Sequence, residues 1–279
     1  MSQSLQPENL APLPVSVVVV VKNMQETLEE CLKSIRKNSP AEIIVIDGNS
    51  KDRTVSIARE NADKVYSDEG KGPSYAHQLG AETASQEFIA FVDGDVVLPE
   101  NSLRIMLEEI KTTRCGNIQA RMIAASRGTY WERVQDWQQT LHESRMPGGL
   151  TAALLRRDLV LSVGFDCSNI HGEDFDFLSR LKKKGYEVSN SKAFVYHHYR
   201  SNILEVIRAY RRVGDSSRML IRKWGVWHTE FWPQLSFLYW LSVCIVKGKP
   251  WYIPYVLVSS AARAYGMLVF NQQPYNDRG

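Results

Sequence analysis

Six of the seven residues from Val15 to Val21 are valine, and only Ser16 is polar. A short run of β-branched residues is typical of a strand buried on both faces, as in a parallel sheet. Further apolar runs follow, and they alternate with segments of helical spacing. The apolar runs are 42–46, 64–66 and 88–92, and the helical segments are 23–36, 51–58, 74–83 and 99–110. This alternation predicts an α/β fold with a doubly wound sheet.

The apolar run from Phe88 to Val92 leads directly into Asp93-Gly94-Asp95. Two carboxylates are therefore expected at the carboxyl end of a strand, where open α/β sheets bind their ligands. Hard divalent cations prefer carboxylate oxygens and also hold diphosphate oxygens. Gly94 is expected to let the backbone turn tightly between the acids. The alternative is a turn without a ligand, because both residue types favour turns.

Several classes of protein are disfavoured. No GxGxxG follows the first predicted strand and no GxxxxGK[ST] occurs, which argues against dinucleotide-binding and P-loop sites. A net charge of +3 is too small to indicate nucleic-acid binding. The four cysteines form no CxxC pair, so no zinc site or disulfide framework is indicated. Residues 1–14 do not resemble a signal peptide, so a cytoplasmic location, or the cytoplasmic face of a membrane, is expected.

The middle of the chain has a mixed pattern. We expect strands at 118–124, within 148–155 and at 193–196, and helices at 129–143, 157–163 and 173–183. Gly185 is expected to end the last of these helices. His197 and His198 follow the last predicted strand.

The C-terminal part differs from the rest of the chain in composition and charge pattern. Residues 201–223 form a basic amphipathic segment, predicted to be one helix or a pair, and its positive charge is suited to phosphates, anionic lipid or water. Residues 231–246 and 251–270 are apolar and aromatic. Arg263 within the second stretch argues against a span, since a charge at mid-depth is costly in lipid. Helices in the membrane interface, or a re-entrant hairpin, are expected. A dimer interface or packed helical layer is the alternative.

Six motifs in this order resemble family 2 glycosyltransferases with a GT-A fold. They are residues 17–23, residues 42–54, Gly72 to Gly80, residues 91–95, residues 171–176 and His197. The resemblance covers roughly residues 15–200 and implies a Rossmann-like mixed sheet flanked by helices. The apolar and amphipathic helical extension predicted above would follow it. Residues 1–200 would form the GT-A domain, with a nucleotide-binding half at about 15–110 and an acceptor half at about 111–200. Residues 201–279 would form the helical, membrane-associated region.

The resemblance also implies a donor site with Mn²⁺ or Mg²⁺. Asp47 would accept the uracil N–H of a UDP-sugar, although it also suits a turn cap. Lys71 would contact nucleotide or phosphate, or lie in solvent. Asp95 would ligate the metal, and Asp93 would contact ribose or a metal-bound water. His197, or His198, would add a metal ligand, and alternation along the strand favours His197.

The acceptor side is expected around Gly149, Glu173, Asp174 and Asp176. By resemblance Asp174 is the general base that deprotonates the acceptor hydroxyl, and its acidic neighbours would raise its pKa. The family often has Arg-Asn where this chain has His77-Gln78. No QxxRW motif follows, so transfer of a single sugar is expected. Arginines of the basic segment would then reach the diphosphate: Arg208, Arg211 and Arg212.

The sequence therefore predicts an inverting, metal-dependent and non-processive glycosyltransferase. Its acceptor would be a glycan or a lipid-linked molecule in glycolipid, lipid-linked glycan or surface polysaccharide synthesis. A polyprenyl-phosphate sugar synthase is one alternative, and a non-catalytic, membrane-docked nucleotide-sugar-binding protein is another. A homo-oligomer is left open.

Overall fold

The computed structural model describes residues 11–143, 149–168, 172–225 and 237–269. Its strands are β1 Leu13–Val21, β2 Pro40–Asp47, β3 Lys64–Ser67, β4 Phe88–Asp93, β5 Val96–Val97, β6 Cys115–Ala124, β7 Ala152–Arg156 and β8 Glu187–His197. They form one mixed sheet in the order β3-β2-β1-β4-β7-β6-β8-β5. Strands β1 to β4 pair in parallel, as the sequence predicts, and β7 is antiparallel to both its neighbours.

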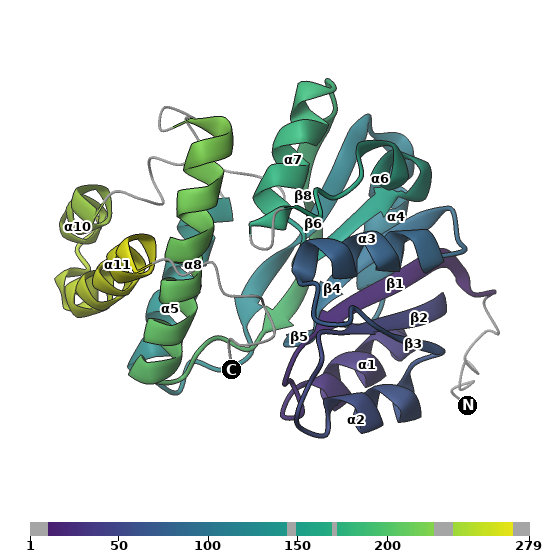
Figure 1. The fold of residues 1–279 in the computed structure, drawn as a ribbon, viewed down its shortest axis with the longest axis horizontal. Helices are drawn as coiled ribbons and strands as arrows, with labels where there is room; N and C mark the ends of the chain where they lie inside the picture. The colour runs from purple at the N-terminus through teal and green to yellow at the C-terminus, as the bar shows by residue number, and fades with distance from the viewer. Residues whose placement is uncertain (1–10, 144–148, 169–171, 226–236, 270–279) are drawn as a thin grey trace, which may run out of the picture.

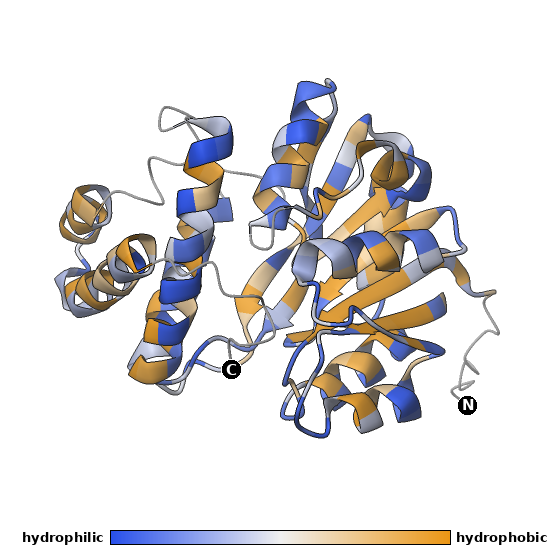
Figure 2. Cartoon of the chain, in the orientation of Figure 1, coloured by the Kyte–Doolittle hydropathy of each residue, from blue (hydrophilic) through white to orange (hydrophobic). Residues whose placement is uncertain are grey.

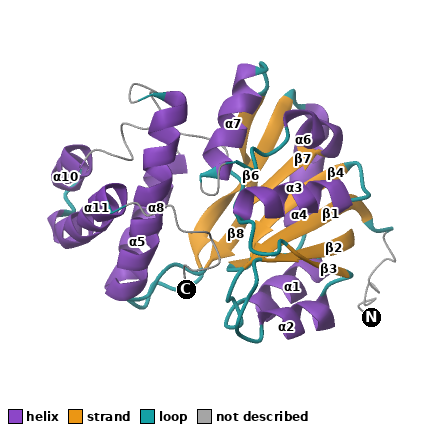
Figure 3. Ribbon diagram, in the orientation of Figure 1, coloured by secondary structure: helices purple, strands orange, loops and turns teal. Residues whose placement is uncertain are grey.

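Helices lie on both faces of this sheet and in a separate group beside it (Figure 1). They are α1 Leu28–Lys37, α2 Thr54–Asn61, α3 Pro73–Thr83, α4 Ser102–Thr112, α5 Tyr130–Glu143, α6 Arg157–Val163, α7 Glu173–Lys183, α8 Ile203–Trp224, α10 Phe237–Val246 and α11 Ile253–Leu268. A short 3₁₀ turn, η1, covers Pro250–Tyr252. The separate group consists of α5, α8, α10 and α11 (Figure 3).

Alternate residues of β1 face two apolar cores. Val17 and Val19 belong to the core under α1, α2 and α4, whereas Val18 belongs to the core under α3, α6 and α7. Burial on both faces explains why the strand is apolar almost throughout, which Figure 2 shows for the whole centre of the sheet. A mixed α/β sheet with helices on both faces and helices at the C-terminus is therefore confirmed.

Three local predictions differ from the structure. The two-residue strand β5 was not expected, and β8 extends over Glu187–His197 rather than 193–196. Helix α1 begins at Leu28 rather than near Asn23, because side chains elsewhere hold the preceding residues as a loop. The Met24 N–H donates to Thr54 Oγ1 at 2.7 Å, and Thr27 Oγ1 donates to the Gly94 carbonyl at 2.8 Å.

The basic segment is a single helix, α8, and α11 packs against it. At their crossing, a Cβ on Gly214 would lie 2.1 Å from the Arg263 carbonyl oxygen, and a Cβ on Gly266 would lie 2.1 Å from that of Arg211. A third apolar cluster, centred on Tyr255, ties α11 to α5 and α8. In the described parts of the chain, no helix is both long enough and apolar enough to cross a membrane. Residues 231–236 and 270, at the edges of the two apolar stretches, lie outside the described residues.

Candidate active site

Pairing between β5 and β8 assembles the first group of site residues. Val96 lies opposite His197 in this antiparallel pair. The histidine at the end of β8 is thereby brought beside the acids that follow β4. Nε2 of His197 lies 3.4 Å from Oδ1 of Asp95. His198 points elsewhere, since its Nε2 lies 3.3 Å from Oε2 of Glu30 on α1.

The two acids differ in proton affinity. Burial opposes ionisation of Asp95, but the adjacent His197 and the charge of Arg200 hold its pKa below the ordinary value. For Asp93, burial and the neighbouring charge of Asp95 raise the pKa to about 7. Asp95 is therefore the more strongly ionised carboxylate at neutral pH.

Asp95 has an oxygen available for a ligand. Its Oδ1 is buried, and no hydrogen-bond partner reaches it from the described residues. Buried polar atoms are normally satisfied, so an orphan of this kind calls for an ion, a water or a ligand. Across the described ranges, no three His, Cys, Asp or Glu side chains gather into a complete metal site. The residues present suit a cation that takes its remaining ligands from water and substrate phosphates, as Mg²⁺ commonly does.

Two glycines are required by space at this site. A Cβ on Gly94 would lie 2.7 Å from the Met24 sulfur and 2.8 Å from Val21 Cγ1, and its φ is not in the left-handed region. Close packing against β1, rather than a special turn, therefore explains Gly94. A Cβ on Gly149 would lie 2.1 Å from Gln119 Oε1, so Gly149 likewise allows close approach to β6.

Asp47 lies at the end of β2 and combines two roles. Its Oδ2 accepts the Ser50 N–H at 3.0 Å, which is the turn-capping interaction that the sequence allows. Its Oδ1 is buried and meets no partner among the residues described. The capping and ligand-binding interpretations are thus compatible, because each uses a different oxygen.

The glycine-flanked loop is organised by Asp68, which the sequence did not single out. The Asp68 carboxylate accepts the N–H of Gly70 at 2.6 Å and of Gly72 at 3.0 Å. Burial, together with the charge of Asp47, raises its pKa. Lys71 points to solvent, where its Nζ lies 2.7 Å from Oε2 of Glu69. An acid two residues before a GxG loop is a local signal that could have identified Asp68.

The second acid pair opens α7. Gly172 has φ 74° and precedes Glu173 at the start of the helix. Burial and the charge of Asp174, with a contribution from Asp93, raise the pKa of Glu173 to about 8. Asp174 is reached by water, yet protein atoms surround it closely enough to raise its pKa too. The charges of the two acid pairs act on one another, since Asp93 contributes to the raised pKa of Glu173 and Asp174 to that of Asp93. His171, the first residue of this motif, lies outside the described residues.

Asp176 makes structural contacts within α7 and with the end of α8. Its buried carboxylate accepts Arg180 Nε at 2.9 Å and Trp224 Nε1 at 3.0 Å, and it lies 2.6 Å from Lys223 Nζ. Lys223 also bonds Asp166 at 2.5 Å. The end of α8 is thereby anchored to the first turn of α7.

His77 and Gln78 stand where the family often has Arg-Asn. Both side chains make contacts inside the protein. Gln78 Oε1 accepts the Phe165 N–H at 2.8 Å, and the His77 ring stacks on Phe165 with 5.1 Å between centroids. Burial lowers the pKa of His77 to about 4. His77 is therefore neutral at pH 7, so its 3.9 Å approach to Glu173 is not an ion pair at that pH.

The three arginines of α8 that were expected to reach the diphosphate have different surroundings. Burial lowers the pKa of Lys22, and the charges of Lys51 and Arg212 contribute to that lowering. Arg211 lies over the Tyr265 ring at 5.3 Å and so helps to join α8 to α11. All three side chains are exposed, and their contact with a diphosphate stays a prediction.

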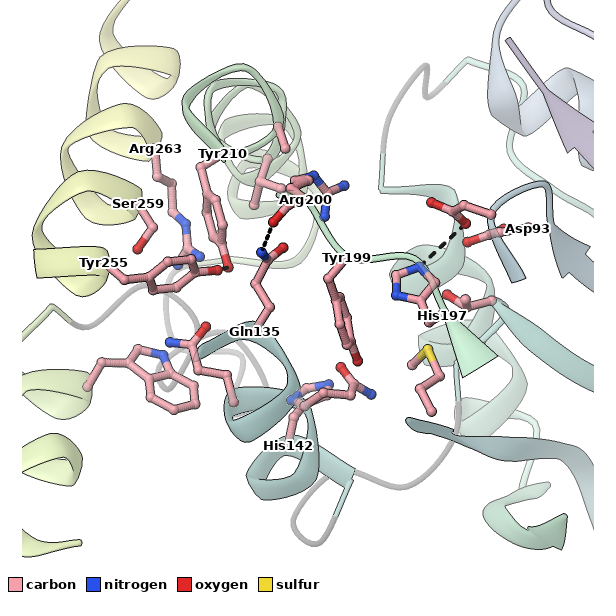
Figure 4. A pocket seen from close by; sticks show the side chains of 18 of the residues that line it. Asp93, Gln135, His142, His197, Tyr199, Arg200, Tyr210, Tyr255, Ser259 and Arg263 are labelled. Carbon is pink, nitrogen blue, oxygen red and sulfur yellow. Dashed lines mark hydrogen bonds and ion pairs between the residues drawn. The ribbon is translucent and has the colours of Figure 1, made fainter. Parts of the chain in front are cut away.

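A cavity of about 490 Å³ extends from the acids toward the helical group (Figure 4). One end is formed by Asp93, Asp95 and His197, and the other by residues of α8, α10 and α11. The sequence did not mark most of its lining: Gln135, Gln138, Gln139, His142, Tyr199, Tyr210, Trp240, Tyr255, Ser259 and Arg263. These residues come together only through tertiary packing of distant helices.

Two solved glycosyltransferases have a similar fold. Mannosyltransferase PcManGT from Pyrobaculum calidifontis, solved with GDP-Man and Mn²⁺, matches with TM-score 0.57 and 18% identity over 98% of this chain and 81% of that chain. Glucosyl-3-phosphoglycerate synthase from Mycobacterium tuberculosis, solved with Mn²⁺, UDP and glucosyl-3-phosphoglycerate, matches with TM-score 0.55 and 19% identity over 77% of this chain and 81% of that chain. These likenesses show the GT-A fold.

Sequence relatives point the same way. Glycosyltransferase AglE of Haloferax volcanii is 26% identical over 258 residues, which cover 86% of this chain and 83% of that protein. A dolichyl N-acetyl-alpha-D-glucosaminyl phosphate 3-beta-D-2,3-diacetamido-2,3-dideoxy-beta-D-glucuronosyltransferase of Methanococcus voltae is 23% identical over 270 residues, 84% of this chain and 82% of that protein. Fold and site together define a glycosyltransferase that acts on nucleotide sugars. The sequence model described as glycosyl transferase family 2 matches residues 16–167, more than half of the chain, and the chain belongs to that family.

Proposed function

We propose that this glycosyltransferase transfers one sugar from a UDP-sugar to an acceptor hydroxyl, with inversion at the anomeric carbon. One observation carries the proposal: the acids around the β4 and α7 ends differ in proton affinity. Asp95, which faces His197 at 3.4 Å, has a lowered pKa, whereas burial raises the pKa of Asp93, Glu173 and Asp174. Pairs of acids with separated proton affinities are the usual arrangement for distinct roles in one reaction.

The donor site lies along the ends of β1, β2 and β4. The free Oδ1 of Asp47 is placed to accept the ring N–H of uracil. The N–H groups of the 70–72 loop are held by Asp68, so that loop has a fixed shape beside the base. Both features support a uridine nucleotide as the donor.

Asp95 and His197 are the residues that would hold Mn²⁺ or Mg²⁺. Their facing atoms are 3.4 Å apart, and Oδ1 of Asp95 is unsatisfied by the described residues. When bound, such a cation would neutralise charge on the leaving diphosphate. Arg200, which lines the same cavity, adds positive charge beside Asp95.

Asp174 is the proposed general base. Glu173 has a pKa of about 8 and is mostly protonated at neutral pH, so it is the poorer base there. Asp174 is reached by water and has a raised pKa, which suits proton transfer near neutral pH. In the reaction, the acceptor oxygen bonds to the anomeric carbon as the carbon–oxygen bond to the diphosphate breaks. The acceptor proton passes to Asp174.

The helices on the acceptor side also have a surface suited to contact with a membrane. The exposed faces of α10, η1 and α11 are apolar, with Leu238, Val246, Trp251 and Leu268 each more than half exposed. Lys247 and Lys249 lie in the turn between these helices. Apolar side chains flanked by lysines suit the surface of an anionic membrane. We propose that this face rests on the cytoplasmic side of a membrane and brings a lipid-linked acceptor to the cavity.

The proposed activity is tested by incubating the protein with UDP-glucose, UDP-N-acetylglucosamine and GDP-mannose, a lipid extract and Mn²⁺. We expect nucleotide release from a UDP-sugar, and proton NMR of the product should show the inverted anomeric configuration. Flotation with phosphatidylglycerol vesicles tests membrane contact, with Trp251→Ser as the variant expected to bind less. Retention of configuration, or release only from GDP-mannose, would contradict the corresponding part of the proposal.

A further inference from the structure

The end of the cavity formed by α8 and α11, which we call its inner end, lies away from the acids and contains the cation of Arg263. Arg263 lines it from α11, together with Ser259 and Tyr255 of the same helix and Tyr210 of α8 (Figure 4). These side chains converge on one end of the cavity, while Asp93 and His197 form the other. None of them was assigned a role in sugar transfer above.

Arg263 lacks the counter-ion that a buried cation normally has. Its guanidinium lies over the Tyr210 ring at 5.2 Å, and no described carboxylate forms an ion pair with it. Its Nε is buried without a hydrogen-bond partner among the described residues. Burial lowers the pKa of its guanidinium. An unpaired buried charge is costly, so its presence calls for an anion that the protein itself does not supply.

Hydroxyl groups around Arg263 complete a site for oxygen atoms. The Tyr210 and Tyr255 hydroxyls lie 2.8 Å apart, so one donates its hydrogen to the other. The accepting hydroxyl keeps its own hydrogen for a further partner. Ser259 Oγ makes only a long contact of 3.3 Å to the Val256 carbonyl. Arginine with hydroxyl donors is well suited to phosphate or carboxylate.

The stretch between the two ends suits a sugar ring. Gln135 and Tyr199 lie between Arg263 and the acids, and Trp240 also lines the wall. Gln135 is held in place because its Nε2 donates to the Arg200 carbonyl at 2.9 Å. The Tyr199 hydroxyl is buried and has no partner within the described residues. An acceptor that reaches from Arg263 to the end formed by Asp93 and Asp95 would therefore pass amide, hydroxyl and aromatic groups.

We propose that Arg263, with Tyr210, Tyr255 and Ser259, binds an anionic group of the acceptor, either a phosphate or a carboxylate. This inference rests on the proposed function and adds the chemical class of the acceptor. The anion would be carried by a water-soluble sugar or by a lipid. In either case the anionic group lies at the inner end of the cavity while the nucleophilic hydroxyl faces Asp174.

The test uses acceptor fragments that differ in charge alone. Glucose, glucuronate and glucose 6-phosphate form a soluble series, and farnesol and farnesyl phosphate form a lipid pair. Binding is followed by tryptophan fluorescence in EDTA, where the acids repel anions from the donor site. The full chain is compared with Arg263→Met and Arg263→Lys, and thermal unfolding checks that each variant is folded.

We expect at least one anionic probe to bind about tenfold or more tightly than its neutral partner. Arg263→Met should abolish that preference, whereas Arg263→Lys should retain part of it. A preference in the soluble series indicates a charged sugar, and one confined to farnesyl phosphate indicates a lipid phosphate. Equal binding of charged and neutral probes, or an unchanged preference in Arg263→Met, would overturn the inference.

A separate titration distinguishes this inference from the proposed function. UDP is titrated with Mn²⁺ into the wild type and into Arg263→Met. If the wild type binds UDP but shows no preference for anionic acceptors, the inference about Arg263 alone fails. If UDP fails to bind at all, the proposed donor site fails, whatever the result with the acceptor fragments.

Discussion

Nε2 of His197 lies 3.4 Å from Oδ1 of Asp95, although Asp95 follows β4 and His197 ends β8. The short strand β5 makes this contact, because its pairing with β8 fixes Val96 opposite His197. A ligand held by both side chains would join the nucleotide side of the protein to the acceptor side.

Replacing His197 and His198 one at a time distinguishes a metal-ligand role from a structural role. His197→Ala should weaken Mn²⁺-dependent UDP binding by about tenfold to a hundredfold, since a metal ligand is lost. His198→Ala is the matched control, because that ring faces Glu30 instead of Asp95. Calorimetry should show its UDP affinity within about twofold of the wild type. A larger effect from His198→Ala than from His197→Ala would reverse the assignment.

Substitutions of two acids at the start of α7 are expected to impair different properties of the protein, catalysis for Asp174 and stability for Asp176. Asp174→Asn should lower kcat by about 10²–10⁴-fold, the usual contribution of a general base, with little change in stability. Asp176→Asn should mainly lower stability, by about 1–3 kcal/mol, because buried Asp176 accepts charge-assisted contacts from the partly exposed Arg180 and Lys223. Nucleotide-release assays and urea unfolding measure the two effects. Full activity in Asp174→Asn would exclude it as the base.

His77 should make stability depend on pH. Its pKa is about 4 in the folded state and near 6.5 when unfolded, so the unfolded chain binds the proton first as pH falls. The contribution is fully present above pH 6.5 and is lost between 6.5 and 4, at up to about 1.4 kcal/mol per pH unit. His77→Phe should flatten the slope of unfolding free energy against pH in that window. An unchanged slope would show that His77 is not buried in its neutral form.

The crossing of α8 and α11 depends on two glycines. Gly214→Ala or Gly266→Ala would place a Cβ 2.1 Å from a backbone oxygen, which cannot yield as a side chain can. Overpacking of this kind costs about 1–3 kcal/mol or more. Ala264→Ser, at an exposed position of α11, is the control and should change stability by less than about 0.5 kcal/mol. Thermal unfolding compares the three variants, and unchanged stability in both glycine variants would contradict this packing.

The sequence predicts where a residue lies in the fold when a local pattern, such as an apolar run, determines that position. Apolar β-branched runs identified the parallel strands, and parallel strands end at one edge of a sheet, so Asp47 and Asp93 were placed correctly at strand ends. Alternation along β8 favoured His197 over His198, and the structure brings His197 to Asp95. The backbone turns at Gly94 as expected, but glycine is needed there because of steric contact with Met24 and Val21, which depends on how the turn packs against β1.

The acceptor end of the cavity could not be predicted from local pattern. Gln135, Tyr210 and Arg263 lie on three helices, and each resembles an ordinary amphipathic-helix residue in the sequence. In the sequence, Arg263 is only a charged residue within the apolar stretch 251–270. Its significance depends on the missing counter-ion, which is a property of the packed structure.

The central claim is that the acids after β4 hold a nucleotide diphosphate through a divalent cation. Calorimetric titration of UDP, with and without Mn²⁺, into the wild type and Asp95→Ala tests it most directly. The account predicts binding that requires Mn²⁺ in the wild type and is lost in Asp95→Ala. Binding of UDP that is equally tight without metal, or unchanged in Asp95→Ala, would contradict it.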